Sequence, residues 1–148
     1  MNKVPIRVDG RFRLKESLGS GSYGMSFILM LIQIQNLWTL LAVVYRAQNI
    51  INGDVVAVKL EPATDHSSSV EREYHILKQL EGGIGIPSAH WFGRESIHHA
   101  LVLDLLGPSL QDIFLARNQK FSLHAVVDLG DQLVSQFLVV AADADLFS

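Results

Sequence analysis

Hydrophobic and polar positions alternate along the first part of the chain in a pattern typical of β-strands. The segment 11–18, RFRLKESL, alternates apolar and polar residues as a half-buried strand does. The segments 43–51 and 54–60 are rich in β-branched residues, and the dipeptide Asn52-Gly53 lies between them. Because a type I′ turn needs positive φ angles at two successive residues, this dipeptide predicts a hairpin with a type I′ turn.

The period of the apolar positions then changes from that of a strand to that of a helix. Ser68 and Glu71 fit the capping-box pattern of a helix start. Apolar residues, Val70 and Leu77 among them, follow at helical spacing. The glycine pair 82–83 is a stop signal, so we expect the helix to end before it.

Two more strands and two more helices complete the predicted order of elements. The segments 90–92 and 99–106 predict a second antiparallel pair. Ser109 is placed to cap a short helix, and Ser122 a longer one that runs to about residue 137. Without the apolar segment described next, the order is strand, hairpin, helix, two strands and then helices. This order predicts an α+β fold with a mostly antiparallel sheet.

The segment 25–45, MSFILMLIQIQNLWTLLAVVY, interrupts this pattern. The chain carries no charged residue between Glu16 and Arg46. As a helix, the segment would rise about 31 Å, close to the roughly 30 Å hydrocarbon core of a bilayer. Polar residues such as Gln33 and Asn36 weaken this interpretation, because a polar group in lipid costs free energy unless it has a partner. We therefore expect no membrane contact unless this segment is a true transmembrane span.

Composition limits the classes of protein to which the chain can belong. Its 148 residues suit one domain, and its net charge of −3 argues against a nucleic-acid partner bound by a broad basic surface. Absence of cysteine excludes disulfides, thiolate zinc sites and a cysteine nucleophile. The first 24 residues contain no apolar region of the kind found in secretory signals, so we expect a cytoplasmic or nuclear protein.

A GxGxxG motif at 19–24 allows two interpretations. In a dinucleotide-binding unit, this motif follows a buried apolar strand and opens a helix. The preceding strand instead carries Lys15 and Glu16, and the region about twenty positions further on offers Arg46 where an acidic residue is expected. The dinucleotide interpretation is therefore disfavoured.

The second interpretation is the glycine-rich loop of a protein kinase. It requires a lysine on the third strand and an acidic partner on the helix that follows. Lys59 ends the run Val56–Lys59, and Glu73 lies on the predicted helix. Taken alone, Lys59 is better interpreted as a surface lysine and Glu73 as a solvated helix residue. The combination with the glycine loop favours the kinase interpretation.

Longer blocks of sequence resemble casein kinase I, a family of serine/threonine protein kinases. These blocks are GSGSYG, VVAVKLEP, EGGIGIP, WFG and LVLDLLGPSLQDIF. The resemblance implies a partial protein-kinase domain over 11–148, with a small lobe at 11–106 formed by a five-stranded antiparallel sheet and helix C. An insert at 25–42 interrupts that lobe, and 107–148 forms a hinge and an incomplete start of the large lobe.

The resemblance also implies an ATP site, with Mg²⁺ as the companion ion and proteins as substrates in the family. Glycines would cover the phosphates, and an ion pair between Lys59 and Glu73 would orient them. Leu18 and Ala57 would line the adenine pocket, with Leu103 at the gatekeeper position and a hinge that begins at Asp104. The implied ATP-binding residues are Leu18, Gly19, Gly21, Gly24, Ala57, Lys59, Glu73, Leu103, Asp104 and Leu106.

The chain departs from the family in two places. About 18 residues, 25–42, stand where the family continues directly from the glycine loop into the next strand. After Gln136 the chain contains no His-Arg-Asp catalytic loop and no Asp-Phe-Gly motif, so the catalytic aspartate and the main magnesium ligand are missing. Because phosphoryl transfer depends on positioning and charge neutralisation, we expect this polypeptide to lack kinase activity.

Two alternatives to an ATP-binding kinase lobe stay open. The first is a non-catalytic module that binds a nucleotide or another protein. The second is a membrane-associated or non-functional fragment that arises from a retained intron at 25–42 and a premature stop. A transmembrane span at 25–45 would place the first two kinase strands on opposite sides of a bilayer, so the span and the kinase sheet exclude each other.

Overall fold

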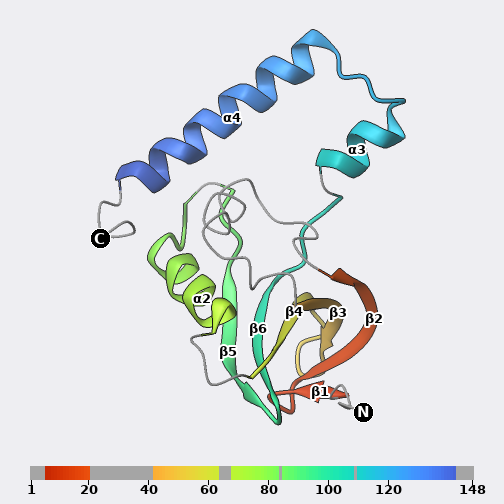
Figure 1. Cartoon of the computed structure of the whole chain (residues 1–148), viewed down its shortest axis with the longest axis vertical. Helices are drawn as coiled ribbons and strands as arrows, with labels where there is room; N and C mark the ends of the chain where they lie inside the picture. The colour runs from red at the N-terminus through yellow and green to blue at the C-terminus, as the bar shows by residue number, and fades with distance from the viewer. Residues whose placement is uncertain (1–5, 21–41, 64–67, 84, 109, 143–148) are drawn as a thin grey trace.

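The computed structural model describes residues 6–20, 42–63, 68–83, 85–108 and 110–142 (Figure 1). The chain builds its sheet and first helix before it enters two further helices. The elements are β1 (Arg7–Val8), β2 (Phe12–Ser20), β3 (Val43–Asn49), β4 (Val55–Pro62), α2 (Ser69–Gln79), β5 (Ala89–Glu95), β6 (His98–Asp104), α3 (Leu110–Ala116) and α4 (Leu123–Ala142).

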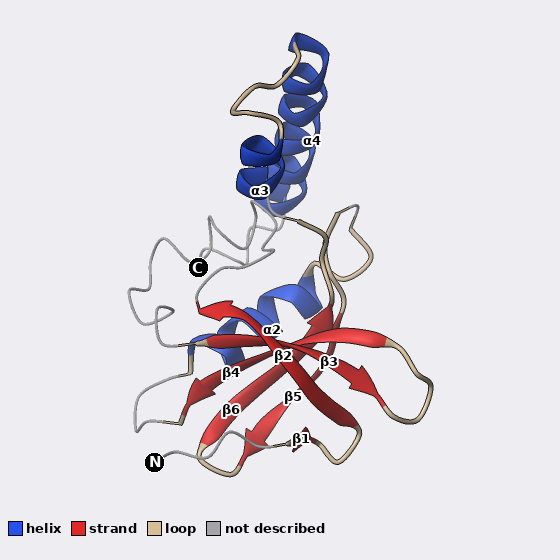
Figure 2. Ribbon diagram, turned by 90° about the vertical axis from the view of Figure 1, so that its right-hand side faces the viewer, coloured by secondary structure: helices blue, strands red, loops and turns tan. Residues whose placement is uncertain are grey.

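The strands form one sheet in the order β1-β2-β3-β4-β6-β5, and every neighbouring pair is antiparallel. Helix α2 lies against one face of this sheet (Figure 2). The α+β class with a mostly antiparallel sheet is confirmed. The prediction of five strands is wrong, because the described residues form six. The additional strand is β1, which is too short to show any alternation.

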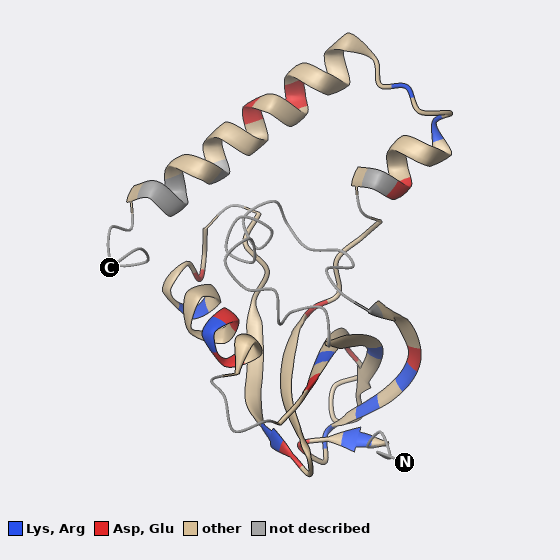
Figure 3. Ribbon diagram, in the orientation of Figure 1, with Lys and Arg blue, Asp and Glu red and all other residues tan. Residues whose placement is uncertain are grey.

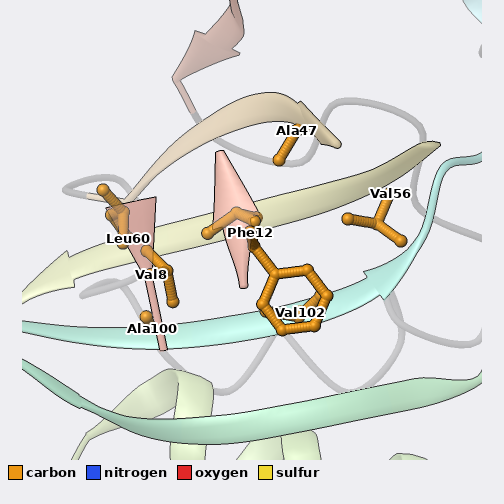
Figure 4. Close-up of a cluster of buried hydrophobic side chains, with 8 residues drawn as sticks. Val8, Phe12, Ala47, Val56, Leu60, Ala100 and Val102 are labelled. Carbon is orange, nitrogen blue, oxygen red and sulfur yellow. The ribbon is translucent and has the colours of Figure 1, made fainter. Parts of the chain in front are cut away.

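The apolar core lies on both faces of the sheet, and β4 is buried along most of its length. Val58 on β4 belongs to a cluster to which β1 and β2 contribute Val8 and Phe12 (Figure 4). Ala57 points to the opposite face and belongs to a second cluster with Val70 and Leu77 of α2. The unbroken apolar run of β4 therefore reflects a central strand that is covered on both sides.

The turn between β3 and β4 differs from the predicted type I′ turn. The strands end at Asn49 and resume at Val55, so a five-residue connection joins them. Gly53 has a φ of 84°, but Asn52 is not among the described residues with positive φ. The Asn49 and Asn52 side chains accept hydrogen bonds from the backbone N–H groups of Ile51 and Asp54, both at 3.0 Å. These local bonds stabilise a longer turn, because asparagine side chains compete with ladder bonds for backbone donors.

Ser20 of β2 and Val43 of β3, which flank the segment 21–42, are register partners. Most of the apolar segment lies outside the described residues. Its last three positions, Val43–Tyr45, belong to strand β3. The prediction of one transmembrane helix over 25–45 is therefore wrong for these three residues. Within the described ranges, no helix is both long and apolar enough to cross a membrane.

Helices α3 and α4 lie beyond one end of the sheet in both views (Figures 1 and 2). The Ser122 Oγ accepts a hydrogen bond from the backbone N–H of Ala125 at 3.2 Å, as expected for a helix cap. Helix α4 continues to Ala142 instead of ending near residue 137, because no glycine or proline follows Gly130 to stop it. Ser109, the predicted cap of α3, lies outside the described residues.

Candidate functional site

Strand β4 and helix α2 bring together the lysine and the carboxylate that the sequence pattern pairs. The Lys59 Nζ lies 2.7 Å from the Glu73 Oε2, and the two side chains are only 4% and 5% exposed. Lys59 lies in the middle of the sheet, in register with Val44 of β3 and Leu101 of β6. The predicted ion pair is therefore present, and it is buried between sheet and helix.

The amphipathic pattern of α2 orients Glu73 toward the sheet. Val70, Glu73 and Leu77 are the buried residues of this helix and recur at helical spacing. The Ser68 Oγ accepts the backbone N–H of Glu71 at 3.2 Å, which confirms the predicted cap. Because Glu73 shares a face with two apolar residues, packing of that face against the sheet carries the carboxylate to Lys59.

Apolar side chains surround the ion pair on the same face of the sheet. Ala57 and Leu103 are buried in one cluster, and Leu18 is half-buried against it. The structure thus brings together the three residues that were predicted to line the adenine pocket or to stand at the gatekeeper position. Val44 and Leu105 belong to the same group, although the sequence interpretation did not include them. The signal for Val44 was the alternation of side chains along β3, because this alternation places Val44 on the same face of the sheet as Ala57.

The predicted hinge begins where β6 ends. Asp104 is the last residue of that strand, and Leu106 follows it half-buried. The Asp104 carboxylate accepts the backbone N–H of Ser88 at 2.8 Å and lies 2.7 Å from the His90 Nε2. Burial alone would raise the pKa of Asp104, but the Ser88 hydrogen bond and the nearby His90 ring outweigh it and hold this pKa below its usual range. The side chain of Asp104 therefore links the end of β6 to the start of the edge strand β5.

Only one glycine of the predicted phosphate loop is described. Gly19 lies in β2 opposite Val44, with a φ of 138° that few other residues adopt. The register of β2 shifts on both sides of Ser17, so the strand is irregular just before the loop. Gly21 and Gly24 lie outside the described residues.

Glu61 is a further buried charge that the sequence interpretation missed. It lies two residues beyond Lys59 on β4, is 8% exposed, and accepts hydrogen bonds from Ser68 and Ser69 at the start of α2. The signal was present in the strand period, because residues two apart on a strand share a face.

Charged side chains are spread over the sheet and α2, whereas the described part of α4 carries only Asp128 and Asp131 (Figure 3).

The groups available for chemistry at this site are one ammonium and one carboxylate beside an apolar surface. A lysine ammonium has three N–H donors, and one of them bonds Glu73. In the described ranges, no group of three or more histidine or acidic side chains could hold a metal ion. No protein-family model matches the chain.

Proposed function

We propose that the chain is an ATP-binding lobe of the casein kinase I type that does not transfer phosphate. The observation that carries this proposal is the buried ion pair between Lys59 of β4 and Glu73 of α2. Replacement of a buried ion pair by packed apolar residues is often neutral or stabilising, so stability alone does not require such a pair. A functional role in binding an anion gives a reason for its presence.

The surroundings of the pair fit a nucleotide that has both an apolar and an anionic end. Leu18, Ala57 and Leu103 supply apolar contacts of the kind that an adenine ring uses, next to the Lys59 ammonium. Phosphate oxygens would accept from the remaining Lys59 donors, while Glu73 holds the lysine in place. In this arrangement, the backbone from Asp104 to Leu106 would bond the adenine edge.

The proposal excludes phosphoryl transfer by this polypeptide. Its sequence offers no His-Arg-Asp and no Asp-Phe-Gly motif, and the two acidic residues of α4 are exposed on a helix. Mg²⁺, the companion of ATP in the family, would lack its main protein ligand here. Because no residue would position the substrate hydroxyl or hold the metal ion, ATP would bind without being turned over. A cytoplasmic or nuclear location belongs to the same proposal.

Thermal denaturation with and without ATP tests nucleotide binding. A ligand that binds only the folded state adds about 2.7 kcal/mol of stability at 100 times its Kd, so ATP should raise the Tm. The double variant Lys59→Met/Glu73→Leu removes both charges without leaving one unpaired, and it should fold but lose the ATP response. The control Lys120→Met, at an exposed position, should keep the response. An unchanged wild-type Tm at millimolar ATP would overturn the proposal.

A second candidate, an interaction module, is favoured by the surface of α4. Apolar side chains on this helix are 51–80% exposed: Leu123, Val126, Val127, Val134, Phe137 and Leu138. Exposed apolar patches of this kind mark sites of association in proteins. A sedimentation profile that depends on protein concentration, and that becomes monomeric after Val127→Glu and Val134→Glu, would favour this candidate over a nucleotide-binding lobe.

A further inference from the structure

Glu61 forms a second polar connection between β4 and α2. Its Oε2 accepts from the Ser68 Oγ at 2.8 Å, from the Ser69 backbone N–H at 3.0 Å and from the Val70 backbone N–H at 3.4 Å. Its Oε1 accepts from the Ser69 Oγ. One buried carboxylate thus receives four donors at the start of the helix. A negative charge is favourable at this end of a helix, because the free N–H groups point toward it.

The spacing of the two connections matches between the strand and the helix. Lys59 and Glu61 are two residues apart on β4, or about 6.8 Å along a strand. Ser69 and Glu73 are four residues apart on α2, or about 6 Å along a helix. The two elements run in opposite directions at this point, so Glu61 meets Ser69 while Lys59 meets Glu73. Two polar contacts, Lys59–Glu73 and Glu61–Ser69, therefore join β4 to α2 side by side.

We propose that Glu61 is a positioning residue that sets the register of α2 on the sheet and so holds Glu73 against Lys59. This inference rests on the proposed function, because the ion pair is the centre of the proposed ATP site. The packing of Val70 and Leu77 decides which face of α2 meets the sheet, but apolar contacts are not directional and leave the helix able to shift along its axis. Glu61 removes this freedom by fixing the helix one turn before Glu73.

A simple capping role does not account for Glu61. The Ser68 Oγ already accepts the backbone N–H of Glu71, so α2 has a cap from its own sequence. Glu61 comes instead from β4 and reaches the helix across the buried interface. A cap stabilises the helix wherever the helix lies, whereas a link from β4 also determines where it lies.

Reactivity of lysine side chains in the full chain tests this role independently of ATP. Acetic anhydride modifies exposed amines, and mass spectrometry of the peptides compares Lys59 with the exposed Lys120. We expect Lys59 to be protected in the wild type, because its side chain is 4% exposed and paired. Glu61→Gln removes the charge and places the donors of its amide group against the donors at the start of α2. We expect the reactivity of Lys59 to rise about tenfold, which is the scale of a lost charge-assisted hydrogen bond. The reactivity of Lys120 should not change.

Two further variants separate the role of Glu61 from a general loss of charge or of stability. Glu71→Gln removes the same charge from the exposed side of the same helix end, and Lys59 should stay protected in it. Ser69→Ala removes one donor to Glu61 and should raise Lys59 reactivity by a smaller factor, which gives a usable result if Glu61→Gln fails to fold. Urea-denatured wild type sets the upper limit of Lys59 reactivity.

The outcomes separate this inference from the proposed function. A lower Tm for Glu61→Gln and Ser69→Ala with Lys59 still protected would overturn the positioning role and leave Glu61 as a helix cap. Exposure of Lys59 in both variants supports the role, even if the wild type shows no response to ATP. If ATP does stabilise the wild type, Glu61→Gln should also weaken ATP binding about tenfold, since Lys59 then lacks its oriented partner.

Discussion

The sheet with α2 and the helical segment that follows it use apolar residues in opposite ways. In the first region, side chains such as Leu77, Leu101 and Val102 are less than 2% exposed, and the buried charges Lys59 and Glu73 are paired. In α4, the polar residues follow one stripe of the helix, and the apolar residues of the opposite face, such as Val127 and Val134, are exposed to solvent. The apolar face of an amphipathic helix normally packs against a core. The first region therefore has a covered core, whereas the apolar face of α4 is not covered by any of the residues that the structure describes.

The largest expected effect comes from breaking the charge pair inside the first region. Glu73→Leu leaves the Lys59 ammonium buried without its partner and should lower the free energy of unfolding by about 3–5 kcal/mol. Lys59→Met/Glu73→Leu should recover most of this loss, because no unpaired charge remains. Urea denaturation measures both variants. Lys78, which pairs with Glu81 at the surface, provides the control, and Lys78→Met should cost no more than about 1 kcal/mol.

A full recovery in the double variant would show that the ion pair is not needed for folding. The finding would strengthen the functional explanation of the pair. If Glu73→Leu instead costs as little as Lys78→Met, then Lys59 reaches water in solution and the pair is not buried as described.

A matched pair of leucine substitutions tests the contrast between the two regions directly. Leu101→Ala, at a fully buried position of β6, should cost about 2–5 kcal/mol by urea denaturation. Leu138→Ala, at a position that is 61% exposed on α4, should change stability by less than about 0.5 kcal/mol. Equal losses would mean that α4 buries its apolar face in solution, against the sheet or against a second molecule, and that the two regions do not differ in this respect.

Strand alternation and helix capping were sufficient to predict most of the sheet and the start of α2. The Lys59–Glu73 contact was also predictable, because the motif places both residues on elements that pack together. Strand β1 was not, since two residues carry no period and the chain reaches β2 through a turn with positive φ at Asp9 and Gly10. The β3–β4 turn was mispredicted because side-chain hydrogen bonds of two asparagines decide its length.

The part of the site that escaped prediction depends on contacts between elements. Nothing in the local sequence around Glu61 shows that its carboxylate faces the start of α2, which lies seven to nine residues further along the chain. The link between Asp104 and His90 likewise joins two strands through their pairing. Residue spacing predicts which side chains share a face, but only the packing of one element on another shows which donors and acceptors meet.

The smallest expected effect concerns the edge of the first region, where Asp104 joins β6 to β5. The folded state holds the pKa of Asp104 below its usual range, so the unfolded chain binds a proton there at a higher pH than the folded one. The stability gained from this carboxylate is therefore complete above about pH 5, and it is lost as the pH falls below about 4 and through the folded pKa. Asp104→Asn should cost at most about 1 kcal/mol at neutral pH, because the side chain is 44% exposed and water screens it.

The difference between wild type and Asp104→Asn should then shrink toward zero as the pH falls through the acidic range. Urea denaturation at a series of pH values measures this difference. Leu138→Ala is the control, since it changes no titratable group and should give a difference that does not vary with pH. A difference for Asp104→Asn that persists unchanged into acid would show that the carboxylate contributes through shape alone. The link between the end of β6 and β5 would then depend on the backbone hydrogen bond from the Asp104 N–H to the Ser88 carbonyl, which the substitution leaves in place.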